Sequence, residues 1–202
     1  MEGRKRFAAW GAAAVVAAAA GAGTIDVIKK DIAANPNDVD LYVELAMEYE
    51  NVKNYKDAAD AYKMALALAP SDANIHFRLA EIYLADEKLP LAVDEYRTTL
   101  RLDAAQSQAH YQMGRAYLGM KEYDNAVNAF TAYGQACPYD LNGLWYLGQA
   151  YEGRGRNDKA LETYEKVLDY CTGAFAQAGK VGVFGTAEDL RKYVAKIRKK
   201  VE

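Results

Sequence analysis

The chain has 202 residues, which is enough for one domain with a hydrophobic core. Its formal net charge of −3 is too small to indicate a nucleic acid or another polyanion as partner. Strand signals are almost absent, whereas apolar residues recur at the three- and four-residue spacing of a helix. The sequence therefore predicts an all-α fold.

The first 24 residues have the character of a targeting segment. A basic start, Arg4-Lys5-Arg6, precedes residues 7–25, which carry no charge and consist mostly of alanine. A basic start, an apolar middle and small residues near Ala20 are typical of a secretory signal peptide. The uncharged run also approaches the ~20 residues that span a bilayer, so a retained membrane anchor stays open. A degenerate helix of the array is the third interpretation.

We therefore assign residues 1–24 to a signal peptide or an N-terminal membrane anchor. Either assignment predicts an exported or membrane-tethered protein on the periplasmic or extracytoplasmic side, because the flanking basic residues stay in the cytoplasm. A cytoplasmic protein is the alternative. Residues 25–36 are apolar at Ile25, Ile28 and Ile32 and end at Pro36, which predicts an N-terminal capping helix.

A unit of 34 residues is written four times within residues 37–174. The copies span about 39–72, 73–106, 107–140 and 141–174. The constant step links a tyrosine in every copy, a small residue and a large aromatic residue: Tyr49, Tyr83, Tyr117 and Tyr151; Ala46, Ala80, Gly114 and Gly148; Tyr62, Tyr96, Phe130 and Tyr164. A fixed period of this size indicates a stacked repeat.

Each copy predicts two helices joined by a short turn. In the first copy, one apolar face includes Leu45 and Tyr49, the turn falls at residues 51–54, and a second face includes Ala58 and Tyr62 before Pro70. The small residue is expected to let two backbones approach closely, and the aromatic residues to fill the surrounding gaps. Neither helix can bury its face alone, so neighbouring copies must stack.

The pattern resembles the tetratricopeptide repeat family. The match is carried by Leu45-Ala46-x-x-Tyr49, Tyr55-x-x-Ala58-x-x-x-Tyr62-x-x-Ala65-Leu66 and Pro70, and the third copy repeats it with Met113-Gly114, Tyr117, Tyr123, Ala126, Phe130 and Pro138. The second copy departs at Thr99 and Ala104, and the fourth at Asn157, Val167 and Thr172. The resemblance implies a right-handed α-solenoid of antiparallel helix pairs, with a concave groove lined by the first helix of each pair.

One stripe of each first helix lies opposite its packing face. Spacings of three, four and three place these residues on one side of a helix. We call them the first-helix stripes: Asp40, Val43, Met47 and Glu50; Asn74, Phe77, Glu81 and Leu84; Gln108, Tyr111, Arg115 and Leu118; Asn142, Trp145, Gln149 and Glu152.

The first-helix stripes predict a binding surface for an extended peptide. Phe77, Tyr111 and Trp145 would contact side chains of the partner, and Asn74, Gln108 and Asn142 would contact its main chain, because side-chain amides both donate and accept. Glu81, Arg115 and Gln149 complete the candidate partner-binding set. Carboxylates outnumber Arg115 on the stripes, which favours a neutral or basic segment. The alternative is that these residues pack against the array's own C-terminal helix or against ordinary neighbours.

The residue types of catalysis are not arranged for it. No Ser-His-Asp set or HExxH motif is visible, and His76 and His110 lie one repeat apart, where stacked helices are about 10 Å distant. We predict no catalytic residue, no metal and no cofactor. Cys137 and Cys171 are also one repeat apart. An exported protein could pair them in a disulfide, and the alternative is two small apolar residues packed at helix ends.

Residues 175–185 are rich in glycine and predict a loop, and residues 186–202 predict a C-terminal capping helix. Thr186-x-x-Asp189 has the form of a capping box, with Asp in place of the usual Glu. The apolar stripe of this helix is Leu190, Tyr193, Val194, Ile197 and Val201, and basic residues cover the rest. A basic helix lying on an anionic membrane or partner is the alternative.

The sequence thus predicts a non-catalytic adaptor that holds a partner protein or an extended peptide in a groove and binds no nucleic acid. A membrane tether through residues 7–25 is possible. The second hypothesis is a structural subunit of a membrane-associated or self-assembling complex, as a homo-oligomer or part of a larger assembly. Such a subunit would use the convex face and the ends of the array.

Overall fold

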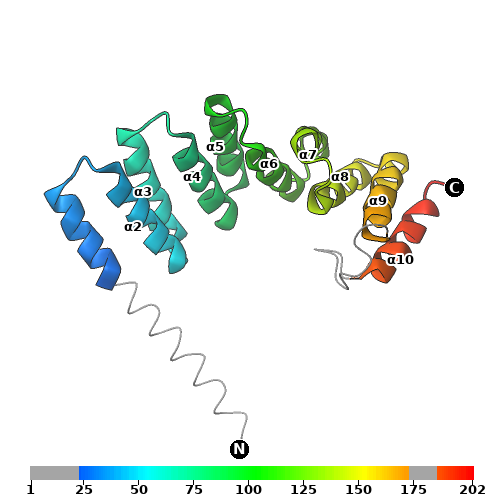
Figure 1. The fold of residues 1–202 in the computed structure, drawn as a ribbon, viewed down its shortest axis with the longest axis horizontal. Coiled ribbons are helices and arrows are strands. Elements are labelled where there is room, and N and C mark those ends of the chain that lie inside the picture. Colours follow the sequence, from blue (N-terminus) through cyan, green and yellow to red (C-terminus); the bar gives the residue numbers. More distant parts are fainter. Residues whose placement is uncertain (1–22, 173–185) are drawn as a thin grey trace, which may run out of the picture. The chain divides into compact units, whose positions relative to one another are not determined.

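The computed structural model describes residues 23–172 and 186–202 (Figure 1). Within these ranges the chain forms helices and no strand, so the predicted all-α class is confirmed. The predicted signal peptide or anchor lies almost wholly in residues 1–22, and the predicted glycine-rich loop in 173–185, outside the described residues. No helix in the described ranges has the length and apolar character needed to cross a membrane.

The chain divides into two compact units, Met1–Leu102 and Asp103–Glu202. In the first unit residues 23–34 are helical, and two helix pairs follow: α2 Val39–Asn51 with α3 Tyr55–Leu68, and α4 Ala73–Ala85 with α5 Leu89–Leu102. Helix α3 also packs on α4. Short turns make the partners in each pair antiparallel.

The second unit repeats this arrangement and adds one helix. Its pairs are α6 Ser107–Gly119 with α7 Tyr123–Ala136, and α8 Leu141–Gly153 with α9 Asn157–Thr172. Helix α7 packs on α8, and α10 Ala187–Arg198 packs on α9. The predicted solenoid of antiparallel helix pairs is confirmed in each unit.

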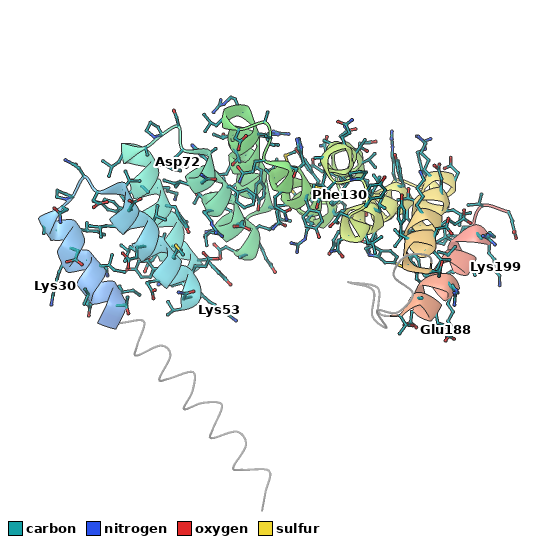
Figure 2. The ribbon with its side chains drawn as sticks, in the orientation of Figure 1. Lys30, Lys53, Asp72, Phe130, Glu188 and Lys199 are labelled. Carbon is teal, nitrogen blue, oxygen red and sulfur yellow. The ribbon has the colours of Figure 1, made fainter. Side chains whose placement is uncertain are left out.

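Polar residues just before the helices fix where several of them begin. The carboxylate of Asp72, labelled in Figure 2, accepts the backbone N–H of Asn74 at 2.8 Å and of Ile75 at 3.2 Å. Asp38 and Asp140 accept in the same way at the starts of α2 and α8. These side chains satisfy N–H groups that have no partner within the helix.

The turn inside every helix pair has a residue with a left-handed backbone at the same position of the repeat. Lys53, Glu87 and Lys121 have φ of 59°, 58° and 60°, and Gly155 has φ of 80°. The next residue donates its N–H to the carbonyl of the repeated tyrosine, as Asn54 does to Tyr49 at 2.8 Å. This is a Schellman-type helix end, for which glycine is the least strained residue. Three of the four turns therefore carry backbone strain.

In the third and fourth repeats the small residue packs directly on the repeated aromatic ring. Phe130, labelled in Figure 2, is 1% exposed, and a Cβ added at Gly114 would lie 2.7 Å from its ring. Gly148 lies against Tyr164 in the same way. In these two repeats the small residue thus gives room to an aromatic ring, and the expected close approach of two backbones stays a prediction.

Helix α10 begins and packs largely as predicted. The capping box is present, since the Thr186 hydroxyl accepts from the Asp189 N–H at 3.2 Å and the Asp189 carboxylate accepts from the Thr186 N–H at 3.0 Å. Leu190, Val194 and Ile197 are buried. Val201 is 45% exposed because α10 ends before it, so its place in the predicted apolar stripe was wrong.

The two cysteines are unpaired and lie in different surroundings. Cys171 is 1% exposed and belongs to the core cluster that α9 forms with α10, where burial raises the pKa of its thiol. Cys137 is half-buried at the end of α7, with its Sγ 3.9 Å from the Ser107 hydroxyl. Cys171 therefore acts as a small packing residue.

Candidate protein-interaction site

The first-helix stripe of α4 offers a half-buried aromatic ring beside polar groups. Phe77 packs edge-on against Tyr96 of α5, with ring centroids 5.6 Å apart. Asn74 is exposed, and Glu81 is half-buried and paired with Arg78 at 3.1 Å. On α2 of the same unit, Met47 is 49% exposed at the equivalent position to Glu81. The first unit thus presents apolar side chains among carboxylates.

On α6 the stripe is more tightly built around Tyr111. Its ring contacts Phe130, Tyr133 and Tyr146, with centroids 6.0, 5.1 and 5.8 Å away. Tyr111 is half-buried, and this burial raises the pKa of its hydroxyl. Gln108 and Arg115 are exposed. One part of the Tyr111 side chain therefore packs in the core and the other part contacts solvent.

On α8 the aromatic residue is covered by the last helix. Trp145 packs against Tyr164 of α9 at 4.8 Å and against Tyr193 of α10 at 5.2 Å. Packing on the C-terminal helix, the alternative interpretation of the stripes, therefore holds at this residue. Asn142 and Gln149 are half-buried, and the buried Asn142 Oδ1 accepts no hydrogen bond from the residues that the structure describes.

An open cleft of about 680 Å³ lies in the second unit. It receives Leu118, Gln149 and Glu152 from the first-helix stripes of α6 and α8. Helices α7, α9 and α10 and the adjoining turn complete it, and its whole lining is Leu118, Tyr123, Gln149, Glu152, Gly153, Gly155, Asn157, Tyr193 and Lys200. The predicted stripes therefore border a real depression, at Gln149 and not at Tyr111 or Trp145.

Glu152 ties α10 to one side of this cleft. Its carboxylate accepts the Tyr193 hydroxyl at 2.5 Å and the Tyr164 hydroxyl at 3.5 Å, and it pairs with Lys200 at 2.7 Å. Burial by itself disfavours the charged carboxylate, but the bonds from Lys200 and Tyr193 outweigh it and lower the pKa of Glu152. Burial and the bond to Glu152 raise the pKa of Tyr193 to about 12. At neutral pH this side of the cleft therefore has an ionised Glu152 carboxylate, which binds the Lys200 ammonium group and the neutral Tyr193 phenol.

The family model described as "Tetratricopeptide repeat" matches residues 43–108 and 111–178. The chain belongs to the tetratricopeptide repeat (TPR) family. The match agrees with the helix pairs described above, in which each pair carries the small and aromatic residues of the repeat. No curated protein sequence matches the chain.

Solved structures with this TPR fold include several titled as MamA. "Crystal structure of MamA" is 26% identical, covering 74% of this chain and 88% of that chain with a TM-score of 0.70. "Crystal structure of MamA protein" is 24% identical, covering 79% and 87% with a TM-score of 0.73. "MamA 41-end from Desulfovibrio magneticus RS-1" is 21% identical, covering 81% and 92% with a TM-score of 0.65. The last two show the fold alone.

The TPR repeats and these neighbours support a protein-interaction scaffold as the general role of the chain. This fold is of a non-catalytic scaffold kind. Among residues 23–172 and 186–202, no group of three or more His, Cys, Asp and Glu side chains could hold a metal ion. His76 instead contacts Glu95 at 2.7 Å and the Pro70 carbonyl at 3.2 Å, and burial lowers the pKa of His110.

Six residues that line the cleft were not predicted from the sequence as site residues: Tyr123, Gly153, Gly155, Asn157, Tyr193 and Lys200. Tyr123 lies over Gly153, so close that a Cβ there would overlap its ring. The glycine one repeat earlier, Gly119, is a signal that could have pointed to this position of the TPR unit. Tyr193 and Lys200 lie outside the 34-residue register, and nothing in the repeat pattern points to them.

Proposed function

We propose that the chain is a non-catalytic adaptor that binds an extended segment of a partner protein on its first-helix stripes. The observation that carries the proposal is the cleft in the second unit, because Leu118, Gln149 and Glu152 of the predicted stripes line it. A cleft bordered by half-buried polar and apolar side chains of the first helices is a place where a further chain can add contacts.

The cleft has the chemistry for a main chain and apolar side chains together. Gln149 and Asn157 supply amides that can donate to and accept from a peptide backbone. Leu118, Tyr123 and Tyr193 supply apolar surface. Because Lys200 pairs with Glu152, this wall of the cleft carries little net charge and does not favour a charged side chain of the partner.

Asn142, on the same first-helix stripe of α8 as Gln149, adds support for a main-chain contact. Its buried Oδ1 has no hydrogen-bond partner in the described part of the chain, and leaving such an acceptor unpaired costs about 1–3 kcal/mol. In the proposed complex a backbone N–H of the bound peptide donates to this oxygen.

The first unit supports the charge preference that we predicted. Its stripes carry Asp40, Glu50 and Glu81 beside the apolar Val43, Met47 and Phe77. Carboxylates around the exposed Met47 and the half-buried Val43 and Phe77 favour a segment with basic and apolar residues. We therefore expect a partner whose bound segment is neutral to basic.

The experiment is affinity capture with the full chain, Gln149→Arg and Asn128→Arg, followed by mass spectrometry. Asn128 is exposed on α7 and does not line the cleft, so its variant adds the same charge elsewhere. We expect Gln149→Arg to lose a partner that the wild type and Asn128→Arg retain, with an unchanged helical circular dichroism spectrum. Equal recovery by all three chains would contradict binding at the cleft and favour a structural subunit that uses other faces.

We also propose that residues 1–24 direct the chain to the membrane or across it. The support is the basic start and the uncharged run of residues 7–25. Cell fractionation with an intact mass of the mature chain tests this. A full-length chain found only in the cytoplasmic fraction would contradict it.

A further inference from the structure

The third repeat lacks a leucine that the other three repeats have. Near the end of α3, α5 and α9, equivalent positions hold Leu66, Leu100 and Leu168, and all three are half-buried. The third repeat has Gly134 there, in the last turn of α7. An aliphatic side chain therefore occupies this position in every repeat except the third.

Close packing does not explain this glycine. A Cβ built at Gly134 meets no atom within 4 Å, whereas one built at Gly114 would lie 2.7 Å from the Phe130 ring. Gly134 has a helical backbone, where glycine costs up to about 1 kcal/mol relative to alanine. The glycine thus lowers helix stability at a place where the structure has room for a side chain.

The missing leucine leaves an apolar pocket between α7 and α8. The Gly134 pocket has a volume of about 220 Å³, and its lining includes Phe130, Gly134, Cys137, Gly143, Leu144 and Leu147. No charged residue lines it. Gly143 of α8 lines the facing side, where the Tyr133 ring packs on it so closely that a Cβ would lie 2.7 Å from the ring. The volume is below the ~300–1,000 Å³ of small-molecule sites, so it suits a single side chain.

We propose that the Gly134 pocket receives an aliphatic side chain of leucine size from a partner protein. The guest replaces the side chain that Leu66, Leu100 and Leu168 supply within the chain. The inference rests on the proposed role as a protein adaptor, but the pocket and the cleft share no lining residue, so the two sites can fail separately.

The occupant's chemistry follows from the pocket. Burial of a leucine side chain contributes about 1.5–3 kcal/mol, which is a factor of about 10–100 in affinity. A carboxylate or ammonium group would lose its hydration in the pocket without gaining a charged partner. The guest is therefore Leu, Ile or Met in preference to a polar residue.

The test uses random peptides displayed on phage and selected on the full chain, with Gly134→Leu and Gly134→Ala as the paired variants. Gly134→Leu fills the pocket, whereas Gly134→Ala improves the helix and leaves most of the pocket open. We expect selected peptides that share one aliphatic residue, bind Gly134→Leu at least about tenfold more weakly, and bind Gly134→Ala nearly as well as wild type. Replacing the shared residue of the peptide with Ala should cost the same factor.

Thermal unfolding shows whether the variants are folded, and we expect the midpoint of Gly134→Leu to equal or exceed that of wild type. Peptides whose affinity is the same for wild type and Gly134→Leu would overturn the proposal. A Gly134→Leu chain that turns an oligomer into a monomer without peptide would also overturn it, since a second copy would then be the occupant. Gln149→Arg should leave the affinity of these peptides unchanged. The test of the pocket therefore stays valid even if the cleft binds no partner.

Discussion

The first-helix stripes of α2 and α8 occupy the same four positions of the repeat and meet different neighbours. On α2, Val43 is half-buried and Met47 is 49% exposed. On α8, Trp145 packs against two tyrosine rings, one of them on α10, and Glu152 is held by Tyr193 and Lys200 of the C-terminal segment. The position in the repeat determines which way these side chains face. On α8 the segment after the last repeat then covers Trp145 and binds Glu152.

This difference gives equivalent residues different roles. On α8 the aromatic residue and the carboxylate stabilise the end of the second unit, and the cleft opens beside them at Gln149. On α2 the equivalent residues are the half-buried Val43 and Glu50, and both remain candidates for partner contacts. Substitutions at matched positions of α2 and α8 test these roles.

The largest expected effect comes from Trp145→Ala. Removing this ring leaves a gap between α8, α9 and α10, and we expect it to lower the free energy of unfolding by about 3 kcal/mol. Val43→Ala, at the equivalent position of α2, should cost about 1 kcal/mol because the side chain is smaller and half-buried. Urea unfolding followed by circular dichroism measures both, and equal losses would contradict the assigned roles.

The second effect concerns Glu152. Its carboxylate accepts bonds from Tyr193 and Lys200, so Glu152→Ala removes the acceptor of a half-buried phenol and of an ammonium group. We expect a loss of about 2 kcal/mol and faster amide hydrogen exchange in α10. Glu50→Ala, at the equivalent position of α2, serves as the control and should change stability by less than about 0.5 kcal/mol. Unchanged exchange in α10 would show that Glu152 does not hold this helix.

The third effect is the pH dependence of the same contact. Since the pKa of Glu152 is lowered in the folded chain, its stabilisation is present above the pKa of the unfolded chain, about 4.3, and is lost as pH falls through the folded value. Wild type should therefore be more stable than Glu152→Gln near neutral pH, and this gap should close as the solution is acidified below about pH 4. A gap that stays constant between pH 7 and pH 3 would contradict the ionised pairing.

The smallest effect comes from the left-handed turn residues. Lys53→Gly, Glu87→Gly and Lys121→Gly relieve a strained φ, and each should raise the free energy of unfolding by about 0.5–1 kcal/mol. Gly155→Ala should lower it by a similar amount. Lys56→Gly in the first turn of α3 is the matched control and should be destabilising. A loss of stability in all three turn variants would show that the lysine and glutamate side chains matter more than φ.

The sequence could predict what depends on the 34-residue period and on local capping. Helix pairs, the burial of Tyr62, Tyr96, Phe130 and Tyr164, and the capping box at Thr186 follow from patterns within a few turns of the chain. The strained turns could not be predicted, because Lys53, Glu87 and Lys121 carry no mark of a left-handed backbone. The prediction that Val201 belongs to the apolar stripe was wrong because the helix ends at Arg198, where no proline or glycine in the sequence marks the end.

The candidate site was only partly predictable. The stripes on α6 and α8 pointed to Leu118, Gln149 and Glu152, which line the cleft. Tyr193 and Lys200 come from a helix outside the repeat register, so no comparison between repeats could place them against α8. The Gly134 pocket, in contrast, was present in the sequence as the one exception to Leu66, Leu100 and Leu168.

Site-specific photo-crosslinking shows whether the first-helix stripes bind the partner. Benzoylphenylalanine would replace Gln149 in one chain and Asn128, exposed on α7, in the other. We predict a crosslinked partner protein from position 149 and none from position 128 after irradiation in cells. A partner captured from position 128 and absent at position 149 would contradict binding at the cleft.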